Sequence, residues 1–428
     1  MSISKPEIII IGAGASGLSA GLRLANQYHV TILEARKRIG GRIHSLEKSE
    51  FSSVVELGAE FIHGNLPTTF ELIQKYNLKT TATGGIPIRF ANGKLVPGDF
   101  YFDHWDEFVQ QLQKLKQDLP VAEFLNIYFN DEKYESLRNS IRGFAEGYDA
   151  ADTNLASTFA LRDEWLNERD EQQFRLVDGY GKLMQCMAEE IQMNGGEIIL
   201  NSAVKQIKWE KNNIEVSCLS GEKYTAGKII ITVPVGVMQS KSIEFSPAIP
   251  DIESAFQNLG YGHVIKFLFE FENKFWETAE MHPAIKQMGF LFGQQEIPTW
   301  WTQYPSPQPL LTGWLAGPNA LALKNKSDDE LYKIALQSLS DIFGMDINEI
   351  SNKLIAGQIT NWPADEFAMG AYSYATLNAH EARKIIMQGV DEIIWFAGEG
   401  IYDGREMGTV EAALASGKLV ADVLLKFR

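Results

Sequence analysis

Cysteine is scarce in this chain: only Cys186 and Cys218 occur in 428 residues. The two form no Cys-x-x-Cys motif, and the seven histidines form no cluster with the spacing of metal ligands. Structural zinc sites are usually built from such groups. We therefore expect no structural metal site.

The chain also lacks an excess of positive charge and any long hydrophobic run. It has 39 Lys and Arg residues against 55 Asp and Glu residues, a net charge of −16. This balance argues against unaided binding to nucleic acid or to anionic lipid. No segment is long and apolar enough to cross a membrane. The first expected strand begins near Glu7, which leaves no room for a signal peptide, so we expect a cytoplasmic protein. The sequence is compatible with a homodimer.

The segment from residue 8 to residue 42 carries the strongest pattern. Four isoleucines, Ile8 to Ile11, indicate a buried parallel strand. Gly12, Gly14 and Gly17 follow with Gly-x-Gly-x-x-Gly spacing, and a helical pattern begins there. The first glycine allows a tight turn, the second lets a pyrophosphate approach the backbone, and the third lets the helix pack on the strand.

A second strand, residues 30–33, ends at Glu34, which lies 34 − 12 = 22 positions after Gly12. A carboxylate there can accept the ribose hydroxyls of a dinucleotide. The helix start at Ala15 and Ser16 offers free N–H groups and a partial positive charge to phosphates. A glycine-rich turn in an ordinary βαβ unit would leave Glu34 unexplained, so we predict a dinucleotide site.

The remaining patterns predict two domains in an α/β protein of ordinary composition, 45% apolar and 22% charged. Residues 103–177 read as a helical block. Residues 197–200, 204–209 and 214–218 indicate one antiparallel layer, and residues 300–309 indicate an irregular aromatic loop. We predict a doubly wound Rossmann-type domain from residues 1–64, 178–240 and 385–428. Residues 65–177 and 241–384 would form an α+β domain with a mixed sheet and the helical block.

Lys266 lies within an apolar strand, where alternation puts Val264, Lys266 and Leu268 on one face. An unpaired buried ammonium is costly and tends to lose its proton. The alternative is a lysine on an edge strand that extends to solvent. Taken by itself, the strand favours this alternative.

Further blocks occur in a fixed order: residues 33–42, 57–64, 262–271, Trp362 with 370–374, 396–399 and 408–417. In this order they resemble the flavin-dependent amine oxidases, which include monoamine and polyamine oxidases, histone demethylases and bacterial relatives. The resemblance implies the two-lobed fold of that family, with bound FAD rather than NAD. The monoamine-oxidase branch has a cysteine where this chain has Ala371, so we expect noncovalent FAD.

The resemblance also assigns cofactor contacts. Together with the glycine turn and its acid, the predicted cofactor residues are Gly12, Gly14, Ala15, Ser16, Gly17, Glu34, Ala35, Arg36, Gly41, Arg42, Gly58, Ala59, Glu60, Phe61, Val204, Trp362, Gly398, Glu399, Thr409 and Val410. Two of them are arginines, whose planar fork suits pyrophosphate charge. Thr409 and Val410 would begin a second helix directed at the flavin.

The resemblance assigns catalysis to Lys266, as the lysine that holds a water against flavin N5, and to Tyr372, as one wall of an aromatic cage. The other wall, a tyrosine in monoamine oxidases, is Thr409 here, as in the polyamine-oxidase and demethylase branch. His63 matches a histidine near the substrate in some polyamine oxidases, or is a structural histidine. Trp301, with its neighbour Trp300, lines the substrate tunnel or belongs to a core.

The implied activity is oxidation of a primary or secondary amine to an imine, and then an aldehyde, with O₂ reduced to H₂O₂. A C–H bond alpha to nitrogen would give a hydride equivalent to flavin N5. Polyamine oxidation would need acids along the tunnel, and Glu146, Asp149 and Asp152 are candidates that the sequence does not place.

Other functions stay open. An L-amino-acid oxidase or another flavin desaturase would share the scaffold, but an amino-acid oxidase needs an arginine for the substrate carboxylate, and the sequence identifies none. A demethylase is disfavoured because no chromatin-binding segment is recognised. A flavoprotein module without turnover is disfavoured by the intact blocks around Lys266 and Tyr372.

Overall fold

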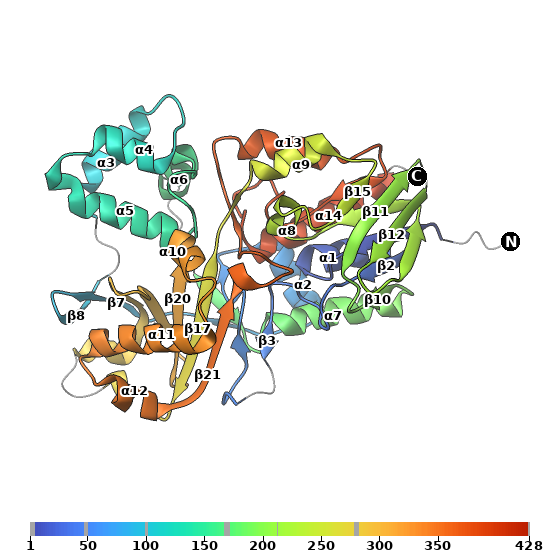
Figure 1. Ribbon diagram of the computed structural model, residues 1–428. Helices are drawn as coiled ribbons and strands as arrows, with labels where there is room; N and C mark the ends of the chain where they lie inside the picture. The colour runs from blue at the N-terminus through green and yellow to red at the C-terminus, as the bar shows by residue number, and fades with distance from the viewer. Residues whose placement is uncertain are drawn as a thin grey trace.

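A computed structural model of the chain describes residues 5–46, 50–98, 102–166, 172–211, 213–277 and 282–426. Figure 1 shows two parts side by side: a parallel sheet between helices and a second β-layer, and a mixed sheet with a separate group of helices above it. This arrangement confirms the predicted two-lobed α/β fold.

The parallel sheet is built from five short strands that come from both ends and the middle of the chain. Their order is β10 (Glu197–Ile199), β2 (His29–Leu33), β1 (Glu7–Ile11), β14 (Lys228–Ile231) and β23 (Ile394–Phe396). Ile8 and Ile10 of the central strand pack into the core on one face, and Ile9 and Ile11 into the core on the other. Burial on both faces requires an unbroken apolar run, which explains the four isoleucines.

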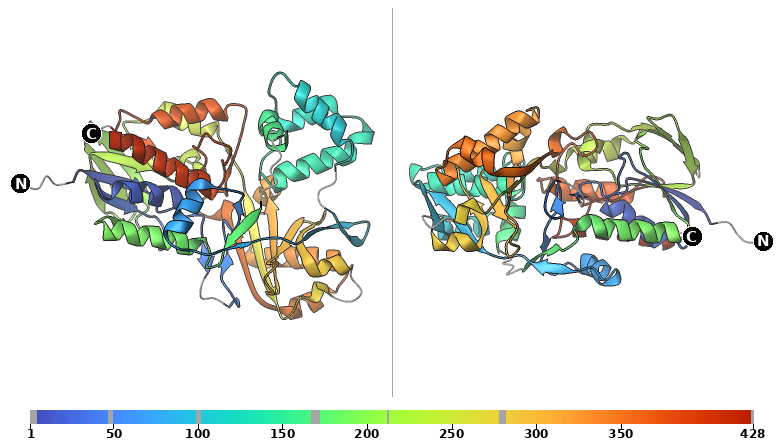
Figure 2. Two further views of the ribbon diagram at one scale, coloured as in Figure 1. Left: turned by 180° about the vertical axis from the view of Figure 1, so that it is seen from behind. Right: turned by 90° about the horizontal axis from the view of Figure 1, so that it is seen from below.

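Helices cover the first face of this sheet. They are α1 (Ala15–Leu24), α7 (Tyr180–Met193) and α14 (Val410–Lys426), with α2 (Pro67–Lys75) beside α14. The C-terminal helix α14 lies directly against α1, as Figure 2 also shows. Ser19 Oγ donates to the Leu414 carbonyl at 2.7 Å, and a Cβ at Gly417 would lie 2.1 Å from the Ser16 carbonyl oxygen. The end of the chain therefore returns beside the glycine turn, as predicted.

A four-stranded layer covers the second face. It comprises β13 (Lys223–Ala226), β12 (Asn213–Cys218), β11 (Val204–Glu210) and β15 (Glu244–Ser246), with α8 (Val235–Gln239), α9 (Pro250–Gln257) and α13 (Ala379–Gln388) in the same core. The expectation that residues 197–200 belong to this layer is wrong, because β10 pairs in parallel with β2. Helix α7 precedes β10 in the chain and packs beside α1, so the segment joins the parallel sheet at its edge.

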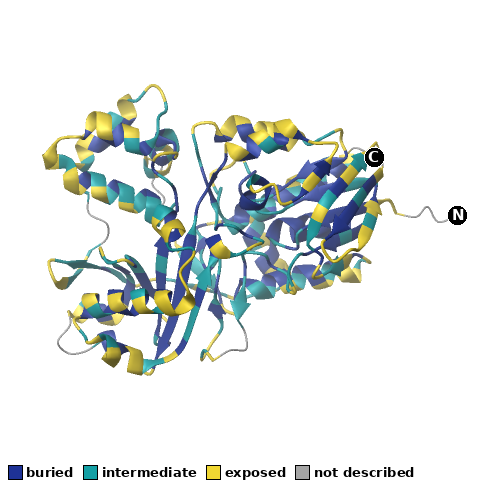
Figure 3. Ribbon diagram, viewed as in Figure 1, coloured by how far each residue is buried: buried dark blue, intermediate teal, exposed yellow. Residues whose placement is uncertain are grey.

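The mixed sheet has seven strands. In order they are β21 (Leu354–Asn361), β17 (Val264–Phe271), β20 (Leu310–Ala316), β19 (Thr299–Thr302), β18 (Met288–Phe292), β7 (Ile86–Ala91) and β8 (Lys94–Pro97). Helices α11 (Asp328–Phe343) and α12 (Ile347–Lys353) share its core. Figure 3 shows its central strands buried and α11 and α12 exposed on their outer faces.

The expectation of an irregular loop at Trp300 and Trp301 is wrong, since both lie in strand β19. Trp300 packs in the core of the mixed sheet, and Trp301, on the opposite face, lines a cavity. Thr and Trp have high β-propensity, and alternation then separates the two indoles.

The helical block forms its own core around Phe108 and Phe124. It contains α3 (Trp105–Lys114), α4 (Val121–Tyr128), α5 (Glu135–Gly147) and α6 (Thr158–Leu166). Smaller elements connect the parts. One small sheet has the strand order β5 (Ile62–His63), β9 (Gln173–Leu176) and β6 (Thr80–Ala82). Two further pairs of strands are β3 (Ser45–Leu46) with β4 (Val55–Glu56) and β16 (Gly260–Tyr261) with β22 (Ser373–Tyr374), and the short helix α10 covers Gly317–Ala322.

The predicted domain boundaries stay a prediction. Helix α9 and part of α13 pack on the parallel sheet, although the predicted boundaries assign residues 241–384 to the other domain. Among the helices that the structure describes, none has the length and apolar character needed to span a membrane.

Candidate cofactor and substrate site

One large cavity extends between the two parts of the protein, with a volume of about 1660 Å³. Its lining includes the turn after β1, the segment around residues 58–63, strands β17 and β19, the loop before β22 and the start of α14. Pockets for a drug-sized ligand usually measure about 300–1,000 Å³. The cavity is therefore large enough for a dinucleotide together with a substrate.

Most of the residues that the sequence marked line this cavity. They are Gly12, Gly14, Ala15, Ser16, Glu34, Ala35, Arg36, Gly41, Arg42, Gly58, Ala59, Glu60, Phe61, His63, Val204, Lys266, Trp301, Trp362, Tyr372, Gly398, Glu399, Thr409 and Val410. Gly17 is not among them. A Cβ on Gly17 would lie 1.9 Å from the Gly12 carbonyl oxygen, so this glycine serves the packing of α1 on β1. Trp300 is likewise absent from the lining, because it is in the core.

The turn after β1 has the backbone that a phosphate site needs. Gly12 has φ +103°, a left-handed conformation that favours glycine, and Gly14 directly precedes α1. Ser16, in the first turn of α1, is buried, and its hydroxyl has no hydrogen-bond partner within the described residues. A buried hydroxyl at a helix N-terminus, facing a cavity, fits a phosphate oxygen.

Glu34 closes the same end of the cavity. Its two carboxylate oxygens accept hydrogen bonds from the Ala13 amide at 2.8 Å and the Arg36 amide at 2.9 Å. These bonds fix the carboxylate at the end of β2, and each oxygen keeps a second acceptor site. The arrangement fits a ribose hydroxyl, and Val204 lines the cavity at the start of β11. The predicted contacts of both residues with the cofactor stay predictions.

The two predicted pyrophosphate arginines are both ion-paired. Arg36 forms a bidentate pair with Asp365, at 2.8 and 2.5 Å. Arg42 donates to Glu399 at 2.8 Å and also to the Ala371 carbonyl. Burial by itself would lower the pKa of Arg42, but Tyr261 and Glu399 more than offset it and raise this pKa. The guanidinium of Arg42 therefore stays charged at the cavity wall.

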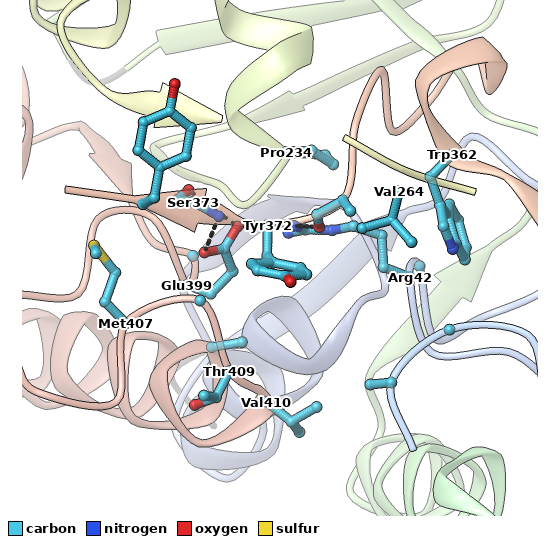
Figure 4. A pocket seen from close by; sticks show the side chains of 18 of the residues that line it. Arg42, Pro234, Val264, Trp362, Tyr372, Ser373, Glu399, Met407, Thr409 and Val410 are labelled. Carbon is cyan, nitrogen blue, oxygen red and sulfur yellow. Dashed lines mark hydrogen bonds and ion pairs between the residues drawn. The ribbon is translucent and has the colours of Figure 1, made fainter. Parts of the chain in front are cut away.

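Figure 4 shows the Glu399 carboxylate directed toward Ser373, with Arg42 and Tyr372 close by. The Ser373 amide and hydroxyl donate to Glu399 at 3.2 and 3.3 Å. Thr409 precedes α14, and its hydroxyl accepts from the Ala412 amide at 3.3 Å. The N-terminus of α14 thus opens into the cavity beside the carboxylate of Glu399, which Arg42 and Ser373 hold in place.

Lys266 lies at the other end of the cavity and is almost fully buried, with 1% of its side chain exposed. Its Nζ donates to Glu60 at 2.7 Å and to the Gly58 carbonyl at 3.2 Å. The alternative that the strand by itself favoured, an edge-strand lysine extending to solvent, is therefore wrong, since β17 lies between β21 and β20. Glu60 belongs to a segment far away in the sequence, and strand alternation gives no information about such a partner.

Glu60 is the centre of this buried group. Burial raises the pKa of its carboxyl, but Lys266 and Arg175 outweigh burial and lower the pKa to about 2. The Trp301 indole N–H also donates to Glu60, at 3.1 Å. The carboxylate is therefore ionised and held from several sides at once.

Aromatic rings form the wall beside Lys266. Trp301 and Trp314 have ring centroids 5.7 Å apart, and Trp314 stacks near Tyr372 at 6.4 Å and 22°. The Tyr372 hydroxyl donates to the Tyr148 carbonyl at 2.6 Å. Trp314 and Thr409 both line the cavity, so an indole that the sequence did not predict lies beside Tyr372 at this wall. Alternation along β20, with Leu311 and Leu315 in the core, would have indicated it.

His63 stays neutral at physiological pH, because burial lowers its pKa. Its ring lies 5.9 Å from that of Phe61 and 6.5 Å from that of Tyr148. It lines the cavity, and its predicted contact with substrate stays a prediction.

Acidic residues of the helical block face the same region. Asp149 lines the cavity, as do Asp163 and Glu164, whereas Glu146 and Asp152 are not among its lining residues. Burial and then the negative charge of Glu164 raise the pKa of Asp149. A second positive charge on a bound amine would relieve that repulsion.

Comparison with known proteins gives one family. A model of the flavin-containing amine oxidoreductases matches residues 15–425. Polyamine oxidase 4 of Oryza sativa subsp. japonica is 26% identical, over 98% of this chain and 88% of its own length. Lysine-specific histone demethylase 1 homolog 3 of Arabidopsis thaliana is 25% identical over 93% of this chain, which spans 28% of that longer protein.

Solved structures share the fold. Putrescine oxidase with bound putrescine superposes with a TM-score of 0.79 at 20% identity, over 99% of each chain. Cyclohexylamine oxidase from Brevibacterium oxydans gives a TM-score of 0.80 at 19% identity, again over 99% of both chains. With the family match and the cavity described above, these likenesses lead to one conclusion: the chain belongs to the flavin-containing amine oxidoreductases, FAD-dependent enzymes that oxidise amines.

Proposed function

We propose that this protein oxidises an amine that is neutral at its reacting nitrogen and carries a positive charge farther along, at the end of the cavity formed by Lys266, Trp301, Trp314 and Tyr372. The observation that supports this most strongly is the continuity of one cavity from the glycine turn at Gly12 to Lys266. A cofactor bound along it would reach from the phosphate-binding turn to that lysine.

FAD, when bound, supplies the redox chemistry: it accepts the hydride equivalent from the carbon alpha to nitrogen and passes the electrons to dioxygen. Its nucleotide half would be held by residues around the glycine turn, namely Gly12, Gly14, Ser16, Glu34 and Val204. Its flavin half would be held by residues near the start of α14, namely Arg42, Glu399, Thr409 and Val410. Among the described residues that line the cavity there is no cysteine, which supports noncovalent binding.

In this proposal the chain itself positions the amine and holds a proton donor. An ammonium has three N–H groups, and the carboxylate of Glu60 and the carbonyl of Gly58 accept two from Lys266. The third is available to a water in the cavity. Trp314 and Tyr372 offer aromatic faces that attract a cationic or neutral amine and exclude solvent water from it.

The charges at this end favour an amine over an amino acid. Asp149, Asp163 and Glu164 line the cavity, and each can attract an ammonium group. An amino-acid oxidase needs an arginine for the substrate carboxylate. Of the lining arginines, Arg36, Arg42 and Arg383 are ion-paired with Asp365, Glu399 and Asp403, and Arg405 lies in the loop before α14, the segment that would hold the cofactor. We therefore propose an amine with a positive charge beyond the reacting nitrogen.

A peroxide-release assay over monoamines, diamines and L-amino acids tests the substrate class. Asp149→Asn should raise KM for a diamine by roughly tenfold and leave a monoamine within about twofold, since one ion pair is lost. Asp152→Asn is the control, because Asp152 is not a lining residue. L-amino acids as the best substrates, or equal effects of Asp149→Asn on both amines, would contradict the proposal.

A further inference from the structure

Arg175 lies partly buried behind the reacting end of the cavity, without being one of its lining residues. It lies on strand β9, which pairs with β5 and β6, and 12% of its side chain is exposed. Its guanidinium lies 4.6 Å from the ring centroid of Phe61 and donates to the Thr302 carbonyl at 3.3 Å. The side chain is therefore held on several sides.

Arg175 and Lys266 bind opposite oxygens of Glu60. Arg175 Nε lies 2.8 Å from Oε1, and Lys266 Nζ lies 2.7 Å from Oε2. The indole of Trp301 and the amide of Gln303 also donate to Oε1, at 3.1 and 3.3 Å. With Oε1 fixed in this way, the carboxylate presents Oε2 to Lys266 in one orientation.

The charge of this group is not balanced. With Lys266 as an ammonium, two cations and one carboxylate give +1 + 1 − 1 = +1 in a buried environment. Glu56 interacts with the charges of Lys266 and Glu60, and burial raises the pKa of Glu56 to about 7. At pH 6 Glu56 is mostly protonated, so the net positive charge remains.

We propose that Arg175 is a positioning residue that orients Glu60 against Lys266 and leaves a net positive charge beside the reacting end of the cavity, which raises the reduction potential of the bound flavin. The proposal rests on the proposed function, because it takes that end as the place of the flavin ring. A positive charge favours the reduced flavin, which is the more negative form, and the effect is large where water is excluded.

The test is the midpoint potential of the FAD-loaded protein, measured at pH 6 by spectroelectrochemical titration. Arg175→Gln keeps a donor for Glu60 but removes the charge, so the potential should fall. Anaerobic flavin reduction by an amine should slow by roughly tenfold, while the Kd of the amine stays within about twofold. Arg175→Lys keeps the charge and should restore the wild-type potential.

Two comparisons separate this role from a structural one. Arg23→Gln is the matched control, since Arg23 is an exposed residue of α1 paired with Asp422. The proposal would be overturned if Arg175→Gln lowers the Tm but leaves the midpoint potential of the flavin unchanged. It would also be overturned if Arg175→Lys lowers the midpoint potential as much as Arg175→Gln does. If Arg175→Gln does not fold, the lysine variant decides: a retained potential supports the proposal and a lowered one overturns it.

Failure of the proposed function would be seen separately. A protein that binds FAD but oxidises no amine would contradict amine oxidation. Its flavin can still be titrated with a chemical reductant, so the effect of Arg175 on the potential remains measurable.

Discussion

The ammonium of Lys266 lies 2.7 Å from a carboxylate oxygen of Glu60, although 206 positions separate the two residues. Both side chains are buried, at 1% and 5% exposure. A lysine in an apolar strand is costly when it is alone, but here the carboxylate offsets much of that cost. The pair therefore keeps a hydrogen-bond donor at the cavity wall, where the amine is expected to react.

Lys266→Met should abolish most of the activity while leaving FAD bound. We expect turnover to fall by about 100-fold or more, because the donor at this wall is lost. Glu60 remains ion-paired with Arg175 in this variant, so its carboxylate is not left as a buried charge without a partner. The loss of stability should therefore be only about 1–3 kcal/mol. Steady-state kinetics and thermal unfolding measure both, with the exposed Lys418→Met as control. If Lys266→Met changes neither turnover nor the reoxidation of the flavin by oxygen, Lys266 does not act as the donor at this wall.

Glu56 should make the protein less stable as pH rises toward neutrality. Burial raises its folded-state pKa from 4.5 to about 7, against hydrogen bonds from Tyr180 and Ser45 that lower it. The folded protein holds this proton more tightly than the unfolded chain, so the stabilisation present below pH 4.5 is lost as pH rises to about 7. The loss should be on the order of 3 kcal/mol.

Glu56→Gln keeps an acceptor for Tyr180 and removes the titration. The difference in Tm between pH 5 and pH 8 should therefore be smaller in this variant than in wild type. Identical pH profiles of Tm would show that Glu56 titrates normally. Glu60 does not interfere in this window, since its pKa is lowered to about 2.

Gly417 should be required for the contact of α14 with α1. A methyl group there would lie 2.1 Å from the Ser16 carbonyl oxygen and 3.1 Å from the Ala20 amide. Gly417→Ala should cost about 1–3 kcal/mol of stability and weaken FAD binding, because α1 carries the phosphate site. Gly143→Ala in helix α5 has open space and should be neutral or stabilising by up to about 1 kcal/mol. Equal FAD affinity in both variants would argue against this coupling.

Tyr372→Phe should separate the ring of Tyr372 from its hydroxyl. The hydroxyl donates to the Tyr148 carbonyl, and its loss should cost about 1 kcal/mol of stability. The stacked ring beside Trp314 remains, so kcat should stay within about threefold of wild type. Tyr372→Ala removes the ring as well and should raise KM strongly. If the Phe variant loses as much activity as the Ala variant, the hydroxyl takes part in the reaction.

The sequence predicted the elements that have a strong local pattern. Strand β17 has the predicted alternation, with Ile265 and Phe267 in the core opposite Lys266. The glycine turn and Glu34 were predicted because neighbouring residues carry that signal. These features depend on short stretches of chain, which can be interpreted without knowing the fold.

The partners within the site depend on distant segments, and the sequence did not predict them. Arg175 lies 115 positions from Glu60, and the Tyr372 hydroxyl reaches a carbonyl 224 positions away. The sheet that β10 joins and the two faces of β19 are likewise decided by tertiary packing. Only Trp314 had a usable local signal, the alternation of β20.

Anaerobic mixing of the FAD-loaded protein with an amine shows whether the bound flavin oxidises amines. We expect a yellow protein whose flavin absorbance bleaches when a mono- or diamine is added and returns, with release of hydrogen peroxide, when air is admitted. Purified protein that carries no flavin and binds no added FAD, or a flavin spectrum that no amine changes, would contradict this expectation.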